Sequence, residues 1–316
     1  MNKKVIRIIV TAAFALIMFA GSIYDTMDAM SWPGENLALL RNFGFNNNGK
    51  PVLGMVFSAS NDVLTAEKGE VIFSRSGNDT ASKLPSPLGA WTAIDHGDGL
   101  ISIYSRYDDS SGEAIINPED EQVPAVDYSS LTWVEKQQPI ARAGISGWSS
   151  VDGFYFIIYD RKERRWVNPA MIITPMQETA LPQILLLELR NEQGIPTDTR
   201  NISQGRYTIN VNAASVPSSN IVSLTGTQRI LLAPQRITCL VNGQEAGSLN
   251  FEAMTGRDGI LMASRNGLVS ANQIYKNFPA FEIADVFFTR GQVNIEVIVQ
   301  DVTGNSRSVI SRLIVN

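Results

Sequence analysis

The side chains that most often bind a transition metal are scarce in this chain. Its 316 residues include one histidine, His96, and one cysteine, Cys239. A protein zinc site draws most of its ligands from histidine and cysteine, and these two residues cannot fill one without several carboxylates. A single cysteine also excludes an intramolecular disulfide. A Ser-His-Asp triad is disfavoured as well, because it would have to use His96.

Carboxylates are the remaining candidates for a metal site. Seven of them lie in residues 106–130, and the candidates among these are Asp108, Asp109, Glu119, Asp120 and Glu121. Their oxygens could bind a hard cation such as Ca²⁺, but they lack the spacing of a recognised calcium loop. We interpret residues 106–130 as a solvated acidic loop or insertion. We therefore expect no cofactor.

The overall charge argues against nucleic acid as a partner. The chain has 26 Lys and Arg residues against 31 Asp and Glu residues, for a net charge of −5, and its pI is near 5.1. No basic cluster stands out beyond the N-terminus, whereas nucleic-acid binding needs a basic patch or stripe.

Residues 1–22 have the three parts of a secretory signal peptide. Lys3, Lys4 and Arg7 are basic, residues 8–20 are apolar, and small residues follow at Ala20-Gly21-Ser22. The apolar run is shorter than the roughly 20 residues that span a membrane. We therefore favour a cleaved signal over a retained anchor, which would tether the protein to the membrane. Export without disulfides predicts the periplasm or cell envelope of a bacterium.

The elements that position any site are predicted to be strands, so the fold class is mainly β. Alternating apolar segments bounded by turn residues predict strands at residues 52–57, 70–74, 91–95, 100–104, 154–159, 184–189, 207–211, 237–241 and 293–300. Asp98-Gly99 and Asn242-Gly243 predict hairpin turns. We expect helices only at residues 25–42 and, as a single turn, at residues 270–275.

Three prolines predict a domain boundary, because proline disrupts central strands. Pro169, Pro175 and Pro182 lie close together. The boundary separates a β domain of residues 31–175 from a second one of residues 181–316. In the second domain, short strands with turns every 8–12 residues are typical of a β-sandwich.

Four segments of the first domain occur in an order that resembles a known family. Asn61–Val71 is similar to "G-x-V-x-A-x-x-G-x-V", and His96–Arg106 to "H-G-x-G-x-x-T-x-Y-x-H". Pro139–Gly147 is similar to "x-I-G-x-x-G-x-T-G", and Gly153–Pro169 to "H-L-H-F-E-I…V-N-P". This series resembles the lysostaphin/LytM-type zinc endopeptidases, which cut peptide cross-links in peptidoglycan. The tail from Gly291 resembles immunoglobulin-like bacterial β-sandwiches.

The resemblance implies a set of site positions that this chain does not fill with metal ligands. The family's H-x-x-x-D motif matches Val52 and Val56, and its H-x-H pair matches Gly153 and Tyr155. The last histidine of the hairpin matches Arg106. Valine and glycine have no side-chain lone pair, and arginine keeps its proton. His96 matches a family residue that is not a ligand.

The leading hypothesis is therefore a catalytically inactive, peptidase-like pseudoenzyme of the cell envelope. Its former cleft, at Arg106, Tyr155, Tyr104 and His96, is expected to bind peptidoglycan or an envelope protein such as a cell-wall hydrolase. Arg106 could grip a carboxylate bidentately. His96, beside Asp95 and Asp98, could take up a proton in mildly acidic surroundings.

Two alternatives stay open. The first is an active zinc-dependent peptidoglycan endopeptidase with an atypical site. The second is a binding module in which the C-terminal sandwich carries the function and the peptidase-like domain is a scaffold.

Overall fold

The described part of the chain is almost entirely β-structure, as the alternation of apolar residues predicts. A computed structural model describes residues 30–59, 62–75, 87–108, 132–147, 152–174, 181–197, 201–216, 221–223, 226–228 and 230–316. The helical elements in these ranges are α2 (Ala271–Tyr275), which confirms the predicted single turn, and a 3-10 turn at Pro169–Met171. The expected signal peptide and most of the acidic loop of residues 106–130 lie outside them.

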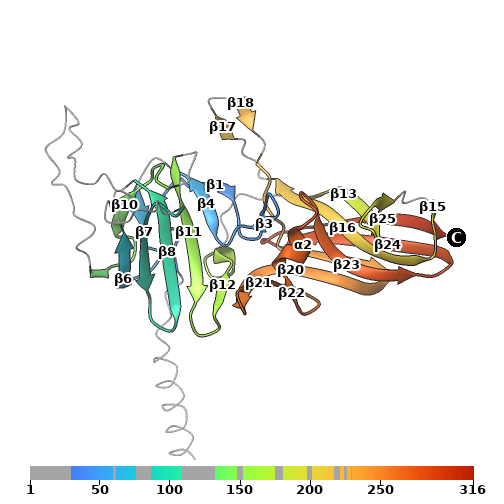
Figure 1. The fold of residues 1–316 in the computed structure, drawn as a ribbon. Helices are drawn as coiled ribbons and strands as arrows, with labels where there is room; N and C mark the ends of the chain where they lie inside the picture. The colour runs from blue at the N-terminus through green and yellow to red at the C-terminus, as the bar shows by residue number, and fades with distance from the viewer. Residues whose placement is uncertain are drawn as a thin grey trace, which may run out of the picture. The chain divides into compact units, whose positions relative to one another are not determined.

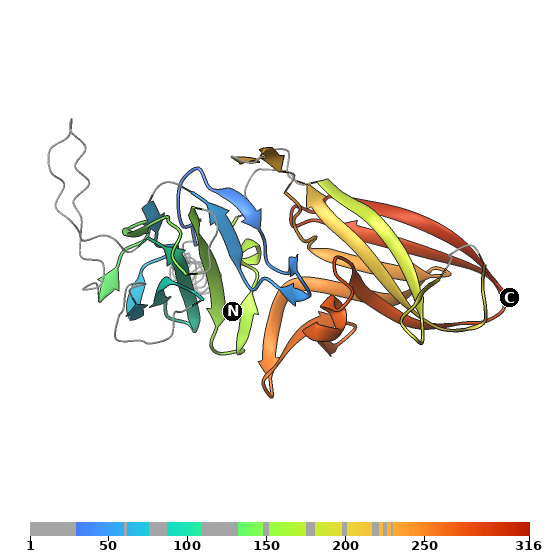
Figure 2. The same ribbon diagram turned by 45° about the horizontal axis from the view of Figure 1, so that its top comes forward.

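Six antiparallel strands of the N-terminal half lie side by side (Figures 1 and 2). β11 (Gly153–Asp160) pairs along one edge with β8 (Leu100–Tyr107), which continues to β7 (Ala90–Asp95) and β6 (Gly69–Arg75). Along its other edge β11 pairs with β4 (Met55–Ser58), which pairs with β1 (Ala38–Arg41). Both faces of β11 are covered, and its apolar run from Phe154 to Ile158 is buried. This is the pattern expected of a central strand.

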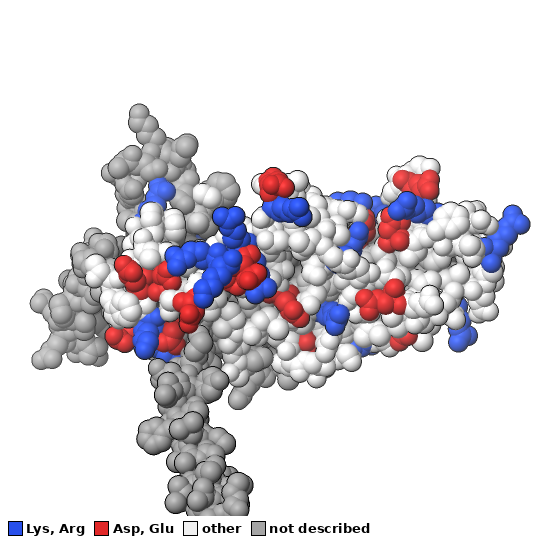
Figure 3. All heavy atoms as spheres, turned by 90° about the horizontal axis from the view of Figure 1, so that it is seen from below, with Lys and Arg blue, Asp and Glu red and all other residues white. Residues whose placement is uncertain are grey.

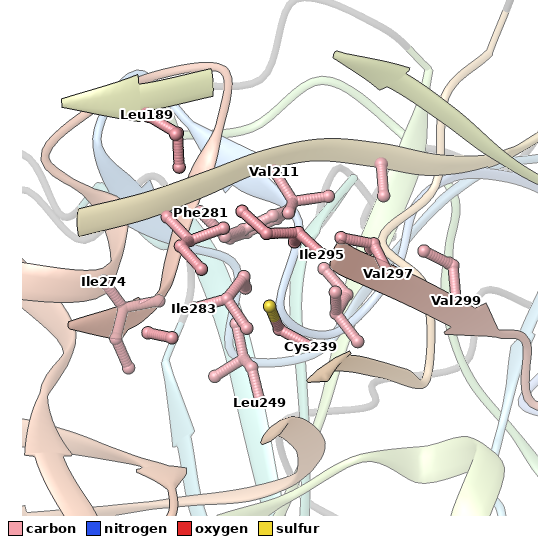
Figure 4. Packing of buried hydrophobic residues seen from close by; sticks show 14 of the residues in the cluster. Leu189, Val211, Cys239, Leu249, Ile274, Phe281, Ile283, Ile295, Val297 and Val299 are labelled. Atoms are coloured by element: carbon pink, nitrogen blue, oxygen red, sulfur yellow. The ribbon is translucent and has the colours of Figure 1, made fainter. Parts of the chain in front are cut away.

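The C-terminal half contains two sheets that pack face to face. One joins β14 (Pro196–Thr197), β13 (Leu181–Asn191), β16 (Gly205–Val216) and β23 (Phe281–Phe288). The other joins β15 (Asn201–Ile202), β25 (Ser306–Val315), β24 (Gly291–Gln300), β19 (Arg236–Val241) and β20 (Gln244–Arg257). Inward-facing residues of both sheets form one core, in which Val211, Ile283 and Ile295 surround Cys239 (Figure 4). These strands therefore form a β-sandwich.

Shorter strands complete the described part. They are β2 (Asn46–Asn47), β3 (Lys50–Pro51), β5 (Asp62–Leu64), β9 (Trp133–Val134), β10 (Pro139–Arg142), β12 (Arg165–Val167), β17 (Ile221–Ser223), β18 (Gly226–Gln228), β21 (Ile260–Arg265) and β22 (Leu268–Ser270).

Residues 31–316 form one compact unit. β12 pairs with β11 on one side and with β20 on the other, so one sheet continues from the N-terminal strands into the sandwich. Phe43 is fully buried in the sandwich core, and the Tyr275 hydroxyl donates to the carbonyl of Gly44 at 2.7 Å. The division into domains of residues 31–175 and 181–316 stays a prediction.

The two predicted hairpin turns are present and the longer predicted helix is wrong. Asn242 and Gly243 have φ of 51° and 81°, the positive values that the turn between β19 and β20 requires. Asp98 and Gly99 have φ of 49° and 91° in the turn between β7 and β8. Of the helix predicted for residues 25–42, residues 30–42 are described and contain no helix, because residues 38–41 pair with β4 as strand β1. Among the described residues, no helix has the length and apolar character needed to cross a membrane.

A basic cluster that the sequence analysis missed lies at the turn between β11 and β12. Four cations follow one another within five exposed residues, namely Arg161, Lys162, Arg164 and Arg165. Carboxylates lie beside three of them, at 3.1 Å for Arg161–Asp95, 3.6 Å for Lys162–Asp98 and 3.3 Å for Arg165–Asp160. Figure 3 shows Lys and Arg side chains gathered next to acidic ones on this side of the molecule. The cluster is therefore largely neutralised by its own neighbours.

Candidate functional site

Tyr155 lies at the centre of the sheet positions that the sequence resemblance assigns to a catalytic site. It pairs with Val56 of β4 and with Ser105 of β8. Residues directly opposite each other in antiparallel strands point to the same side of the sheet. Val56 and Ser105 therefore share a side with Tyr155, and so do Ile103 and Ile157 two residues along. We call this side the Tyr155 face.

Arg106 reaches the Tyr155 face through a β-bulge. Strict alternation along β8 would place Arg106 on the opposite side, together with Tyr104. The pairing of β7 and β8 shifts here, with Tyr107 opposite Ala90 and Ser105 opposite Trp91, so that Arg106 is the extra residue. Such a bulge re-aims a side chain. The guanidinium carbon of Arg106 consequently lies 5.2 Å from the centre of the Tyr155 ring, in a cation–π contact.

The residues around Tyr155 form an apolar cluster. Val52, Tyr155 and Ile157 are buried together, and Val56, Phe45, Ile103 and Trp166 pack against them. The Tyr155 hydroxyl accepts a hydrogen bond from the backbone N–H of Leu53 at 2.8 Å. Burial raises the pKa of Tyr155 to about 12, so the phenol is neutral at physiological pH.

Gly153 has no room for a side chain. It lies opposite Ser58 of β4, and its backbone also exchanges two 2.9 Å hydrogen bonds with Gly144. A Cβ atom at residue 153 would overlap the carbonyl oxygen of Phe57. Glycine is therefore required here for the close approach of β4 to β11.

The side chains at these positions do not fit a zinc ion. Val52 and Val56 offer no lone pair. The hydroxyl of Tyr155 already accepts a hydrogen bond, and the Arg106 guanidinium over the ring would repel a second cation. Within the ranges that the structure describes, no three or more His, Cys, Asp or Glu side chains are grouped so that they could hold a metal ion.

Tyr104 and His96 lie on the other side of the sheet from Tyr155. Tyr104 is fully buried opposite Phe156, with ring centres 5.3 Å apart, and its hydroxyl accepts from the N–H of Ala66 at 2.7 Å. Burial raises the pKa of Tyr104 to about 12. The structure thus brings together two of the four predicted cleft residues, Arg106 and Tyr155, and separates them from Tyr104 and His96.

His96 is held by a hydrogen-bond chain that ends at Tyr104. Its Nδ1 lies 2.9 Å from the carbonyl oxygen of Lys68, and its Nε2 lies 2.6 Å from Ser102 Oγ, which lies 3.1 Å from the Tyr104 hydroxyl. A carbonyl oxygen only accepts, so Nδ1 carries the proton. Burial lowers the pKa of His96 and outweighs the nearby carboxylates of Glu67 and Asp95, so the ring takes up a proton at a lower pH than an ordinary histidine.

Three side chains near Arg106 and Tyr155 were missed by the sequence analysis. Arg41 lies opposite Val56 and is close enough to lower the pKa of Arg106, although burial is the larger cause. Trp91 lies opposite Ser105, and its ring stacks on the exposed Phe73 with centres 4.2 Å apart. Only strand pairing reveals these contacts, because the five segments are far apart in sequence.

The sandwich has a separate polar pocket of about 370 Å³. It lies over β13, β16 and β23, and its lining includes Arg190, Arg206, Thr208, Lys276, Asn277 and Asp285. Arg206 and Asp285 form a two-pronged ion pair at 2.8 and 2.9 Å. The pocket is therefore polar, with its charges already matched.

Comparison with known proteins gives partial matches. A protein-family profile matches residues 181–316, which is less than half of the chain and does not place the whole chain in a family. No curated protein matches the chain.

Solved structures with a similar fold are distant in sequence. The SpoIIQ–SpoIIIAH pore-forming complex is similar at 18% identity and a TM-score of 0.32, over 46% of this chain and 92% of that one. A zinc-containing peptidase from Vibrio cholerae is similar at 18% identity and a TM-score of 0.32, over 45% of this chain but only 39% of that one. The antimicrobial peptidase lysostaphin from Staphylococcus simulans is similar at 14% identity and a TM-score of 0.31, over 74% of this chain and 85% of that one. Two of these three are peptidases by name, but at such scores none assigns an activity to this chain.

Proposed function

We propose that this chain is an exported, catalytically inactive peptidase-like protein of the bacterial cell envelope. It binds peptidoglycan, or an envelope protein such as a cell-wall hydrolase, without cutting a peptide bond. The observation that carries the proposal is the Tyr155 face itself. The positions that the resemblance assigns to zinc ligands hold the buried Val52, the partly buried Val56, and Tyr155 under an arginine, and the position of one assisting histidine holds Gly153, which has no room for a side chain.

The binding half of the proposal is tested by sedimentation with purified peptidoglycan. We expect the full chain to sediment with it, and the Arg106→Met variant to be retained less, since the substitution removes the charge and keeps most of the length. Arg312 is exposed on β25 and far in sequence from the Tyr155 face, so Arg312→Met is the matched control. Equal retention of the Arg106→Met variant and the wild type would count against this face as the binding surface.

The polar pocket supports a second candidate function, in which the sandwich is the binding module. Thr208 lines the pocket, so Thr208→Trp should fill it. Loss of retention in Thr208→Trp together with normal retention in Arg106→Met would favour the sandwich. The opposite pattern would favour the Tyr155 face.

A further inference from the structure

Three features of Arg106 are energetically unfavourable, in its backbone conformation, its hydrogen bonding and its charge pairing. It is a non-glycine residue with a φ of 67°, in the left-handed region that L-residues rarely adopt. Its Nε–H is buried without a hydrogen-bond acceptor. Its guanidinium has no carboxylate within ion-pairing distance among the described residues. Unpartnered buried polar groups in native structures call for a functional explanation.

A second arginine adds positive charge on the same face of the sheet, since Arg41 lies opposite Val56. Arg41 is exposed, donates to the Asn47 side chain at 3.2 Å, and lies over the Phe45 ring at 5.8 Å. None of the described carboxylates pairs with it. Two neighbouring guanidinium groups without an acid are unusual on a chain whose net charge is −5, and they would be complemented by an anion.

The hydroxyl of Ser105, next to Arg106 in β8, also lacks a hydrogen-bond partner. Ser105 is fully buried between Trp91 and Tyr155 in the strand order, and its Oγ has no partner. Two unsatisfied donors, Ser105 Oγ–H and Arg106 Nε–H, thus occupy consecutive positions of β8. Of the two residues, Arg106 is the partly exposed one, so a ligand with acceptor oxygens would meet its guanidinium.

An apolar surface lies on β6 and β7, directly beside β8, which carries Arg106. The Phe73 ring is 45% exposed and stacks on Trp91. Adjacent strands are about 4.8 Å apart, so Trp91 of β7 and Tyr155 of β11 are separated by about 10 Å. An extended peptide covers that distance in about three residues. Trp, Tyr and Arg are also the side chains most enriched at binding hot spots between proteins.

We propose that the Tyr155 face binds an extended acidic peptide segment. A carboxylate of the segment lies at Arg106 and Arg41, and an apolar side chain about three residues away lies on the Phe73–Trp91 stack. This inference rests on the proposed function, because it names the ligand class of the same surface.

Synthetic peptides test the proposal with the purified full chain. The probe is an octapeptide of glycine and serine that contains one glutamate and one phenylalanine three residues apart, made in both orders. The comparison peptide has glutamine in place of glutamate. We expect the glutamate peptide to bind at least about tenfold more tightly, since hydrogen bonds to a charged group are the stronger ones. The preference should disappear in Arg106→Met and persist in Arg312→Met.

A stability measurement separates binding from a structural role. If Arg106 serves a ligand, Arg106→Met should unfold at the same or a higher denaturant concentration than the wild type, because replacing an unpaired half-buried charge by an apolar side chain is often neutral or stabilising. Equal affinity for both peptides, no binding of either at millimolar concentration, or a preference that survives Arg106→Met would overturn the inference. In those cases the chain could still sediment with peptidoglycan. Failure of the peptide inference is therefore distinguishable from failure of the proposed function, which would show as no sedimentation.

Discussion

His96 illustrates how burial sets the charge of one residue. The His96 Nδ1–H donates to the Lys68 carbonyl, Nε2 lies 2.6 Å from Ser102 Oγ, and the Ser102 hydroxyl donates to the Tyr104 hydroxyl. Burial of the ring disfavours its charged form and so lowers the pKa of His96.

The lowered pKa of His96 predicts a pH dependence of stability. The unfolded chain has the ordinary value of 6.5 and so binds a proton more readily than the folded chain. The free energy of unfolding should therefore be highest above that value and should fall as the pH drops below it. His96→Gln removes the titrating group. Denaturant unfolding from about pH 7 to about pH 5 should show a smaller loss of stability in His96→Gln than in the wild type. An unchanged loss would contradict this assignment.

The two Tyr155-face residues show what the sequence could and could not predict at this scale. Alternation along β8 alone would group Arg106 with Tyr104, whereas the structure places it on the Tyr155 face. The bulge at Arg106 depends on how β7 pairs with β8, and pairing between distant segments cannot be obtained from one strand's own pattern. Strand pairing places Tyr155 opposite Val56, whereas Arg41 was assigned to a helix and so was missed.

At the scale of the strand, Gly153 controls how closely β4 and β11 approach. Gly153→Ala places a methyl group against the Phe57 carbonyl. Overpacking of this kind costs about 1–3 kcal/mol or more. Gly205 of β16 is the matched control, because its added Cβ would come no nearer than 3.7 Å to the Tyr207 ring. We expect Gly205→Ala to be neutral or to stabilise by about 0.5–1 kcal/mol. Equal effects of the two substitutions in denaturant unfolding would refute the close-approach argument.

Glu282 of β23 connects this strand to β21 and to α2 through one buried carboxylate. Its side chain, which is fully buried, contacts Arg265 of β21 at 2.9 Å, Lys276 after α2 at 2.6 Å and Gln273 of α2 at 2.7 Å. Burial alone would raise the pKa of Glu282, but its bonds to Lys276, Arg265 and Gln273 lower it below the ordinary 4.5. The carboxylate therefore stabilises the fold above that pH, and this contribution is lost as the pH falls further.

Removing this charge should be costly. Glu282→Gln leaves Arg265 and Lys276 without their carboxylate, and we expect a loss of about 3 kcal/mol at neutral pH, since Lys276 can turn toward water. Glu245→Gln at the exposed start of β20 is the control and should change stability by no more than about 0.5 kcal/mol. Urea unfolding of both variants at neutral pH checks this. Equal stabilities would show that the three contacts contribute little.

Local patterns predicted most elements because their causes are local. Alternating apolar residues and the Asn242-Gly243 turn act within a few residues, and the strands they predict are present. The strand predicted at residues 52–57 begins instead at Met55, because Gly54 lies against the backbone of Phe156, where a Cβ would overlap the carbonyl oxygen. The segment up to Asn42 was misassigned for a similar reason. Its strand forms only because β4 is available to pair with it.

Across the whole molecule, Cys239 reports on the opening of the sandwich core. It is the chain's one cysteine, it is fully buried between the two sheets, and burial raises the pKa of its thiol to about 12. A neutral, enclosed thiol reacts slowly. We expect iodoacetamide to leave Cys239 unmodified in native buffer, and labelling in urea to follow the loss of circular dichroism with the same midpoint. Rapid labelling of the native protein would show that the core opens locally.

At the scale of the whole molecule, the central proposal is that this peptidase-like protein binds peptidoglycan or an envelope protein without cutting a peptide bond. The side chains of Val52, Val56 and Tyr155, which do not suit a zinc ion, predict that the surface binds without one. The most direct test measures zinc in the purified full chain, after dialysis against zinc, together with the turbidity of a peptidoglycan suspension. We predict no stoichiometric zinc and no loss of turbidity while the chain sediments with the peptidoglycan. One tightly bound zinc ion per chain, with clearing of the suspension, would contradict the account.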